Sequence, residues 1–364
     1  MRRRHLDYPL LAIVLGLLAA GLLMISSASI ALSEKNFGTP YYYVSHQAVA
    51  ALAGLAVLFI FQNIPYRFWR RMSLPILLGS LAATAAVFIP QIGVAAKGAA
   101  RWLDFGFGTI QPSEILKLSL ILYLASWLEK KRGELRGFAA SLVPFLIVLG
   151  AVGGLLAQQK DLGTLIITGG AAVLVYFLGG SRISQIVLLG VIALAAVAAL
   201  IAVEPYRADR ILVFLNPETS LQGAGYHANQ AQIAIGSGGF WGRGFGQSIQ
   251  KHNYLPEPMG DSIFAVIVEE LGFLGGVIFI AAYFAFFVRG IVIARRAPDV
   301  FGRLLVSGLV SLITLQAFVN MAAISGILPL TGIPLPFVSY GGTALIITLA
   351  MAGIMLNVSK AGGR

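Results

Sequence analysis

Long apolar runs separated by short polar connections restrict the fold of this chain more than any other feature. About 20 apolar residues suffice to cross a bilayer as a helix, and a helix satisfies its own backbone hydrogen bonds there. The sequence therefore predicts an all-α, polytopic membrane bundle of ten transmembrane helices, in a single domain over residues 1–364. The predicted spans lie near residues 8–28, 44–64, 74–91, 113–128, 138–158, 162–180, 185–203, 262–289, 303–325 and 341–358.

Composition supports a membrane protein and excludes other classes. Hydrophobic residues make up 58% of the chain and charged residues 11%, whereas a typical soluble domain has about 25% charged residues. The absence of cysteine excludes disulfides and thiolate chemistry. The net charge of +11 is distributed in short clusters between apolar runs. That distribution orients a membrane protein, so we expect membrane lipids and no nucleic acid as partners.

The basic residues also predict the orientation of the bundle. Arginine and lysine are concentrated in the connections on the side of Met1, and basic connections are typically cytoplasmic. We therefore expect both termini in the cytoplasm and one large extracytoplasmic loop at about 204–261. Loops of this length are usually functional or disordered. Aromatic residues spaced among the glycines of residues 236–246 argue against disorder.

Acidic residues mark residues 251–272, where a polar loop runs into an apolar helix. Asp261 and Glu257 precede the apolar run, and Glu269 and Glu270 lie about two turns inside it. Unpaired charge is expensive in hydrocarbon, so such residues are usually paired or functional. Two roles stay open for Asp261. It can cap the following helix, because a short acceptor satisfies the first backbone N–H groups, or it can carry chemistry.

A second polar segment precedes the span at 113–128. Glu114 and Lys117 are three residues apart, hence on one helix face, and can neutralise each other as an ion pair. We expect the pair either to stabilise the bundle or to face a polar cavity. Arg101 lies shortly before it. Asp161, in the polar turn at 159–164, is expected to be a turn residue and a helix cap.

A third segment, residues 320–344, alternates prolines with glycines. Proline lacks a backbone N–H and breaks helices, so the chain must leave regular helix there. Broken backbone at membrane depth is tolerated only against protein or a water-filled cavity. We expect this segment to form a cavity wall that is open to the outside.

Histidines and glycines of the large loop give weaker signals. His227 and His252 are expected to be polar surface, and the four histidines of the chain provide little for a His-rich metal site. The glycines at 236–246 are interpreted either as turns on the membrane surface or as a close approach to a ligand. A nucleotide loop is excluded, because no strand leads into a helix here.

Several separated motifs resemble those of the SEDS family, the FtsW/RodA/SpoVE proteins of bacterial growth, division and sporulation. They occur in the family's order along the whole chain, and Lys251 with the Tyr-Leu-Pro-Glu-Pro run is more similar to FtsW or SpoVE than to RodA. The motifs are Gln111-Pro112-Ser113-Glu114 with Lys117, Asp161-Leu162-Gly163-Thr164, Tyr254-Leu255-Pro256-Glu257 ahead of Asp261, and a C-terminal signature of Asn320, Gly326, Pro329, Gly332, Ser339, Tyr340, Gly341 and Gly342.

The resemblance implies ten spans and a peptidoglycan glycosyltransferase in the bacterial cytoplasmic membrane. Such an enzyme polymerises lipid II into a lipid-linked glycan strand on the outer face, beside a class B penicillin-binding transpeptidase. It also implies that Asp261 is the catalytic acid. This chain departs from the family where His-Thr commonly precedes that acid and Phe follows it, because Met259, Gly260 and Ser262 stand there instead.

The chemistry of the implied reaction identifies candidate site residues. A carboxylate such as Asp261 can take the proton of the attacking sugar hydroxyl, and the leaving pyrophosphate needs positive charge or N–H donors. We assign no metal ligands, although Mg²⁺ or Mn²⁺ bound by Asp261 and Glu257 stays open. The predicted substrate-binding residues are Glu114, Lys117, Arg101, Arg210, Arg243, Lys251, Glu257, Ser339 and Tyr340.

Two other functions are compatible with such a fold. A flippase or transporter of the lipid-linked precursor also needs a polar cavity and a lipid groove, but it would place charged groups near the midplane. This chain gathers its polar motifs on the outer half instead. A scaffold that only recruits a transpeptidase would leave the buried acids unexplained.

Overall fold

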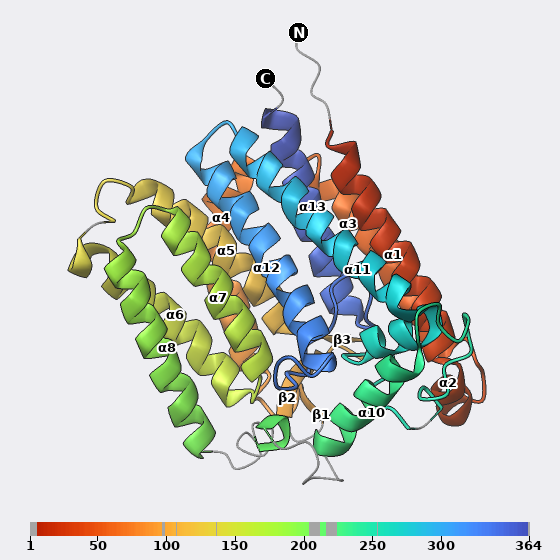
Figure 1. Cartoon of the computed structure of the whole chain (residues 1–364). Coiled ribbons are helices and arrows are strands. Elements are labelled where there is room, and N and C mark those ends of the chain that lie inside the picture. Colours follow the sequence, from red (N-terminus) through yellow and green to blue (C-terminus); the bar gives the residue numbers. More distant parts are fainter. Residues whose placement is uncertain are drawn as a thin grey trace.

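Helices dominate the described part of the chain (Figure 1). The structure is a computed structural model that describes residues 6–96, 99–106, 108–135, 137–203, 212–215, 224–252 and 254–362. The helices are α1 (Tyr8–Ala28), α2 (Ile30–Phe37), α3 (Tyr42–Phe61), α4 (Tyr66–Ala86), α5 (Pro112–Lys130), the π-helical turn η1 (Phe138–Leu142), α6 (Val143–Gln158), α7 (Leu162–Leu178), α8 (Ile183–Val203), α10 (Ala224–Ser237), α11 (Ile263–Arg296), α12 (Val300–Ile324) and α13 (Gly342–Gly362).

The predicted spans all coincide with helices, namely α1, α3 to α8 and α11 to α13. Within the described residues, 7 helices are long and apolar enough to cross a membrane. Helices α4 and α5 carry more charge, and α7 is shorter at 17 residues. The chain is thus a multi-pass helical bundle, while the number of ten spans stays a prediction.

The all-α prediction is wrong for the connection between α4 and α5. This connection forms an antiparallel sheet of three strands, β1 (Gly93–Ala96), β2 (Ala99–Asp104) and β3 (Thr109–Ile110), in the order β1-β2-β3. Only two residues separate β1 from β2, and such short glycine-containing connections are typical of hairpins. The hairpin was missed because its strands are short and alanine-rich.

Helix α12 lies at the centre of the bundle and packs against α5, α7 and α11 (Figure 1). Small residues allow this close packing. They are expected at such contacts because, within lipid, the hydrophobic effect does not favour helix association and van der Waals packing must do so. A Cβ on Gly308 of α12 would lie 2.5 Å from Ile121 and 2.7 Å from Val175. Likewise, a Cβ on Gly353 of α13 would lie 2.6 Å from the carbonyl oxygen of Leu58.

The start of α1 and the end of α13 lie side by side (Figure 1). The backbone N–H of Asp7 donates to Ser359 Oγ at 3.2 Å, and Arg289 Nη2 lies 2.8 Å from Asp7 Oδ2. At the same end, burial and the Asp299 carboxylate raise the pKa of the Tyr66 hydroxyl to about 12. We call the opposite end of the bundle, which carries the sheet, α2 and α10, the outer end.

Candidate active site

Helix α11 is broken at Gly272, which adopts φ 72° and ψ −172° inside the helix. The glycine-rich loop at 238–246 fills this break. Its amides at Arg243 and Gly244 donate to the carbonyls of Glu269 and Glu270 at 3.0 Å each. Its carbonyls at 239 and 240 accept from the amides at 273 and 274, at 2.9 and 3.3 Å. Two backbone groups on each side of the break are thereby satisfied, and buried backbone groups in a membrane protein need such partners.

Glycine is required on both sides of this contact. A Cβ on Gly272 would lie 2.3 Å from the nitrogen of Gly242, and one on Gly242 would lie 2.2 Å from the carbonyl oxygen of Glu270. The positive φ at both positions also disfavours any side chain. Of the two interpretations of these glycines, the structure supports close approach, but to the backbone of α11.

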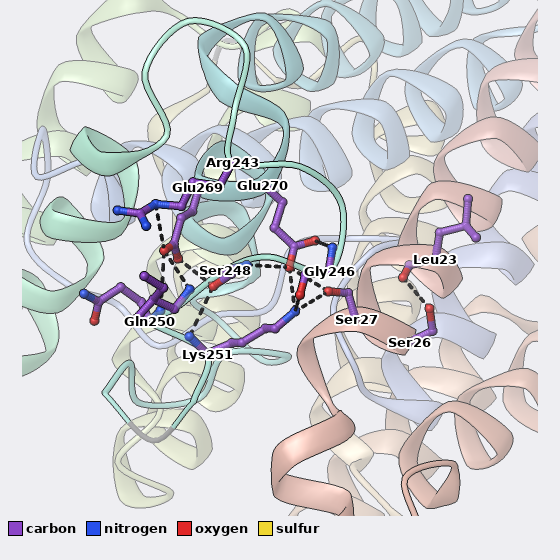
Figure 2. A network of polar contacts seen from close by, with 11 residues as sticks. Leu23, Ser26, Ser27, Arg243, Gly246, Ser248, Gln250, Lys251, Glu269 and Glu270 are labelled. Atoms are coloured by element: carbon purple, nitrogen blue, oxygen red, sulfur yellow. Dashed lines mark hydrogen bonds and ion pairs between the residues drawn. The ribbon is translucent and has the colours of Figure 1, made fainter.

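The acids Glu269 and Glu270 are completely buried on the outer part of α11, and Figure 2 shows the groups that bind them. Glu270 Oε1 lies 2.8 Å from Lys251 Nζ and accepts from Ser27 Oγ of α1 at 2.6 Å. Glu269 accepts from Ser248 Oγ at 2.5 Å. Amides of the loop add further bonds, from residues 246 and 248 to Glu270 and from residue 249 to Glu269.

The ammonium group of Lys251 has its three N–H bonds engaged. It donates to Glu270 Oε1, Ser27 Oγ and the carbonyl of Gly246, each at 2.8 Å, and the residue is 4% exposed. An ammonium has three donors and no more. We therefore assign Lys251 to the structural network that joins the loop to α1 and α11, although the sequence analysis included it among the predicted substrate-binding residues.

Asp261 lies in the turn that leads into α11, but it is not the helix cap. The N-cap is Ser262, and its side chain makes no cap hydrogen bond. Its hydroxyl is directed backwards and donates to the carbonyl of Pro256 at 2.8 Å. The capping interpretation of Asp261 is therefore wrong. The turn at 256–262 is closed further by amides of residues 260 and 262, which both donate to the carbonyl of Glu257.

Helix α12 and the non-helical segment at 325–341 that follows it hold this turn from one side, and the segment lies where loss of helix was predicted. Asn320 Nδ2 donates to the main-chain carbonyl of Asp261 at 2.8 Å. Ser339 Oγ donates to the carbonyl of Gly260 at 2.6 Å, and the amide of Tyr340 donates to the carbonyl of Met259 at 2.8 Å. These bonds fix the position of Asp261 through its backbone.

Ser339 and Tyr340 therefore stabilise the backbone of the turn that carries Asp261. The ring of Tyr340 packs edge-on against Tyr43 of α3, with centroids 5.3 Å apart. Burial, with the neighbouring Tyr42 and Tyr43, raises the pKa of Tyr340 above its usual value. Its hydroxyl stays protonated at neutral pH and can donate a hydrogen bond to a substrate.

A third contact reaches the turn from α10. The Nε2 atom of His227 lies 2.6 Å from Ser262 Oγ. Sequence reasoning assigned His227 to the polar surface, and this was wrong, because the residue is half-buried and bonded to the neighbour of Asp261. The only available signal in the sequence was that His227 and Asp261 belong to the same predicted loop, at about 204–261. Sharing a loop does not specify what a side chain contacts.

The predicted ion pair of Glu114 and Lys117 is confirmed. Lys117 Nζ lies 2.8 Å from Glu114 Oε2, and both side chains are almost fully buried. Lys117 also donates to Gln316 Oε1 of α12 at 2.8 Å, and Gln316 Nε2 donates to the carbonyl of Pro334 at 2.9 Å. The pair thus supports the proline-containing segment that braces Asp261.

The other predicted site residues are more dispersed. Arg101 on β2 donates to the carbonyls of Gln159 and Lys160, in the turn before α7. Arg243 lies 3.6 Å from Glu269 with a side chain 37% exposed, and Glu257 is exposed beside the turn. Asp161 caps α7, as predicted, by accepting from the amide of Thr164 at 3.2 Å. Arg210 lies outside the described residues.

No group of three His, Asp or Glu side chains within the described ranges is arranged to hold a metal ion. The site thus consists of one turn at the outer end of α11, held by α10, α12 and the segment before α13. Fold and site together define a multi-pass membrane protein that carries an acid on a braced turn at the end of the bundle opposite the start of α1.

Comparison with known proteins identifies the family. The model of the FtsW/RodA/SpoVE family, described as "Cell cycle protein", matches residues 8–362, and the chain belongs to this family. It is 40% identical over 353 residues to the "Probable peptidoglycan glycosyltransferase FtsW" of Geobacter metallireducens, covering 97% of this chain and 94% of the relative. It is 37% identical to "Stage V sporulation protein E" of Bacillus subtilis, covering 97% of each chain.

A solved structure agrees with this relationship. The chain matches one described as "Structural coordination of polymerization and crosslinking by a peptidoglycan synthase complex", with a TM-score of 0.82 and 29% identity over 98% of both chains. The apolar helices and this family membership make the chain a multi-pass protein of the inner membrane.

Proposed function

We propose that this chain is a peptidoglycan glycosyltransferase that polymerises lipid II into glycan strands at the outer face of the cytoplasmic membrane. Its relatives bear the name of that activity. The observation that carries the proposal is the braced turn. Hydrogen bonds from Asn320, Ser339 and Tyr340 reach the main-chain carbonyls of residues 259–261 and fix the backbone that carries Asp261.

In the proposed reaction, Asp261 acts as general base. It takes the proton of a sugar hydroxyl on one lipid-linked sugar, and the oxygen attacks the anomeric carbon of the other. The bond from that carbon to the pyrophosphate breaks, and the lipid pyrophosphate leaves with the electron pair. General base catalysis contributes about 10²–10⁴-fold. A rigid turn assists it, because a displacement of about 1 Å can cost about 10²-fold.

The leaving pyrophosphate needs a cation, and the structure narrows the choice among the predicted ones. Lys251 and Lys117 are buried in ion pairs, and Arg101 binds the carbonyls of a turn. Arg243 keeps the largest exposed fraction of the described ion-paired candidates. We propose Arg243 for this role, with Arg210 as a second predicted ligand.

The proposed orientation places the termini in the cytoplasm and the large loop outside. The start of α1 lies beside the end of α13, and the start of α11, which Asp261 precedes, lies at the opposite end of the bundle, and both support this arrangement. A single cysteine at Gln247, which is exposed on the loop, should react with an impermeant reagent on intact cells. Reaction only after lysis would place the loop in the cytoplasm. Ser220, the second predicted labelling position, lies outside the described residues.

A class B penicillin-binding transpeptidase is the proposed partner, because a new strand must be crosslinked as it is made. The deciding experiment incubates purified chain with labelled lipid II, alone and with such a transpeptidase, and separates the glycan products by length. Strand formation that is lost in Asp261→Asn supports the proposal. Transport of lipid II into vesicles without polymerisation would establish the flippase alternative instead.

A further inference from the structure

Among the described residues, hydrogen bonds reach the turn at 256–262 from α10, from α12 and from the segment before α13, and the contact from α10 differs from the others. The bonds from Asn320, Ser339 and Tyr340 all come from the C-terminal part of the chain and reach carbonyls at 259–261. The His227 contact comes from α10 and reaches Ser262, on the other side of Asp261. The acid therefore lies between two separate sets of contacts.

Hydrogen-bond accounting determines the direction of the His227 contact. A serine hydroxyl has one hydrogen, and in Ser262 it is donated to the carbonyl of Pro256, which can only accept. The hydroxyl oxygen must then accept from His227, so Nε2 of His227 carries the hydrogen. Two consecutive hydrogen bonds therefore close the turn. They run from His227 Nε2 to Ser262 Oγ, at 2.6 Å, and from Ser262 Oγ to the carbonyl of Pro256, at 2.8 Å.

The Ser262 hydroxyl makes these two hydrogen bonds in place of the usual helix-capping bond. A serine at an N-cap usually accepts from an amide of the first helical turn, and that bond stabilises the helix. Ser262 occupies the N-cap of α11 and makes no such bond. Completely buried, it instead joins α10 to the turn. Helix α10 itself is anchored on α11, with Ala231 and Ala234 fully buried.

We propose that His227 is a positioning residue for Asp261. By donating to Ser262, it holds the carboxyl-terminal side of the turn and fixes the location of the Asp261 carboxylate relative to α11. The role requires an N–H donor at the end of a side chain of about this length, and does not require a charge. This inference rests on the proposed function, since its main readout is polymerisation.

The test compares His227→Leu, Ser262→Ala, the double variant and His227→Gln in full-length protein, in the form in which the wild type is active. Removing either partner should lower kcat for strand formation by about 10–100-fold, on the scale of a displaced catalytic group. KM for lipid II should stay within about twofold, because His227 acts through Ser262. The double variant should be no slower than the slower single variant.

His227→Gln provides the rescue, because its amide retains an N–H donor. It should recover kcat to within about threefold of the wild type. The matched control is His252→Leu, which removes an exposed histidine from the same loop and should change nothing. Melting temperatures of all variants separate a displaced acid from a damaged fold.

Three results would overturn the inference. They are full kcat in a stable His227→Leu protein, independent and multiplying losses in the double variant, or a His227→Gln protein as slow as His227→Leu. If His227→Leu does not fold, the comparison of Ser262→Ala with the wild type decides alone. An inactive wild type would instead contradict the proposed function.

Discussion

Two acid-bearing regions, one in α11 and one in the turn before it, lie close together in the sequence and are held in different ways. Glu269 and Glu270 are buried, and their oxygens accept from a lysine, two serines and the loop amides. Asp261 is partly exposed, and Asn320 of α12 binds its main-chain carbonyl. The first arrangement uses carboxylates to fix a loop, and the second fixes the backbone that carries the acid.

The comparison predicts its largest effect for Asp261→Asn. The amide has the same size but cannot take a proton at neutral pH, so strand formation should fall by about 10²–10⁴-fold. Melting temperature should change little, because the bracing bonds go to the backbone. Asp261→Glu retains the charge but displaces it, and should cost about 10²-fold. Near-normal strand formation by a well-folded Asp261→Asn protein would remove the base role and direct attention to Glu257.

In the region of Glu269 and Glu270, we expect a substitution to lower the free energy of unfolding. Lys251→Met leaves Glu270 buried without its cation, which should cost roughly 3–5 kcal/mol of unfolding free energy. The double variant Lys251→Met/Glu270→Gln should recover much of this, since no charge remains stranded. Thermal unfolding in detergent measures both. Equal destabilisation of single and double variants would show that the pair is not the stabilising element.

The ion pair of Glu114 and Lys117 should show the same coupling at a smaller scale, because Gln316 also binds the lysine. Glu114→Gln, Lys117→Met and the double variant form a cycle with an expected coupling of about 0.5–3 kcal/mol. The losses should be less than additive. Strictly additive losses in unfolding free energy would mean that the two side chains act independently.

The next prediction concerns the break in α11. Gly272→Ala places a side chain at positive φ and against Gly242, and should destabilise by about 1–3 kcal/mol. Gly236→Ala is the matched control, since a Cβ there has nothing within 4 Å and lies in helix α10. Alanine at that position should be neutral or stabilising by up to about 1 kcal/mol. Equal stability of the two variants would argue against a tightly filled break.

Sequence reasoning located the helices because they depend on local signals. Apolar runs determine where helices form, and the prolines at 329–336 predicted the non-helical segment correctly. The ion pair of Glu114 and Lys117 was predictable because three residues on a helix place side chains on one face.

What the sequence did not reveal depends on contacts between distant residues. Ser27 and Glu270 are separated by 243 positions, and no periodicity indicates that they meet. Lys251 was interpreted as a substrate ligand because its partner could not be known. His227 was assigned to the surface for the same reason, and the sheet at 93–110 was missed because its strands are short.

The break at Gly272 has a consequence for how the protein is made. The loop at 238–246 leaves the ribosome before α11, yet the carbonyls and amides that it satisfies belong to α11. Neither partner can settle in the bilayer alone without exposed backbone groups. We therefore expect insertion of α11 to be completed only after the translocated loop folds back, and Gly242→Val should trap chains with α11 incompletely inserted. Glycosylation-site mapping during synthesis would detect that species, and its absence would show that α11 inserts independently of the loop.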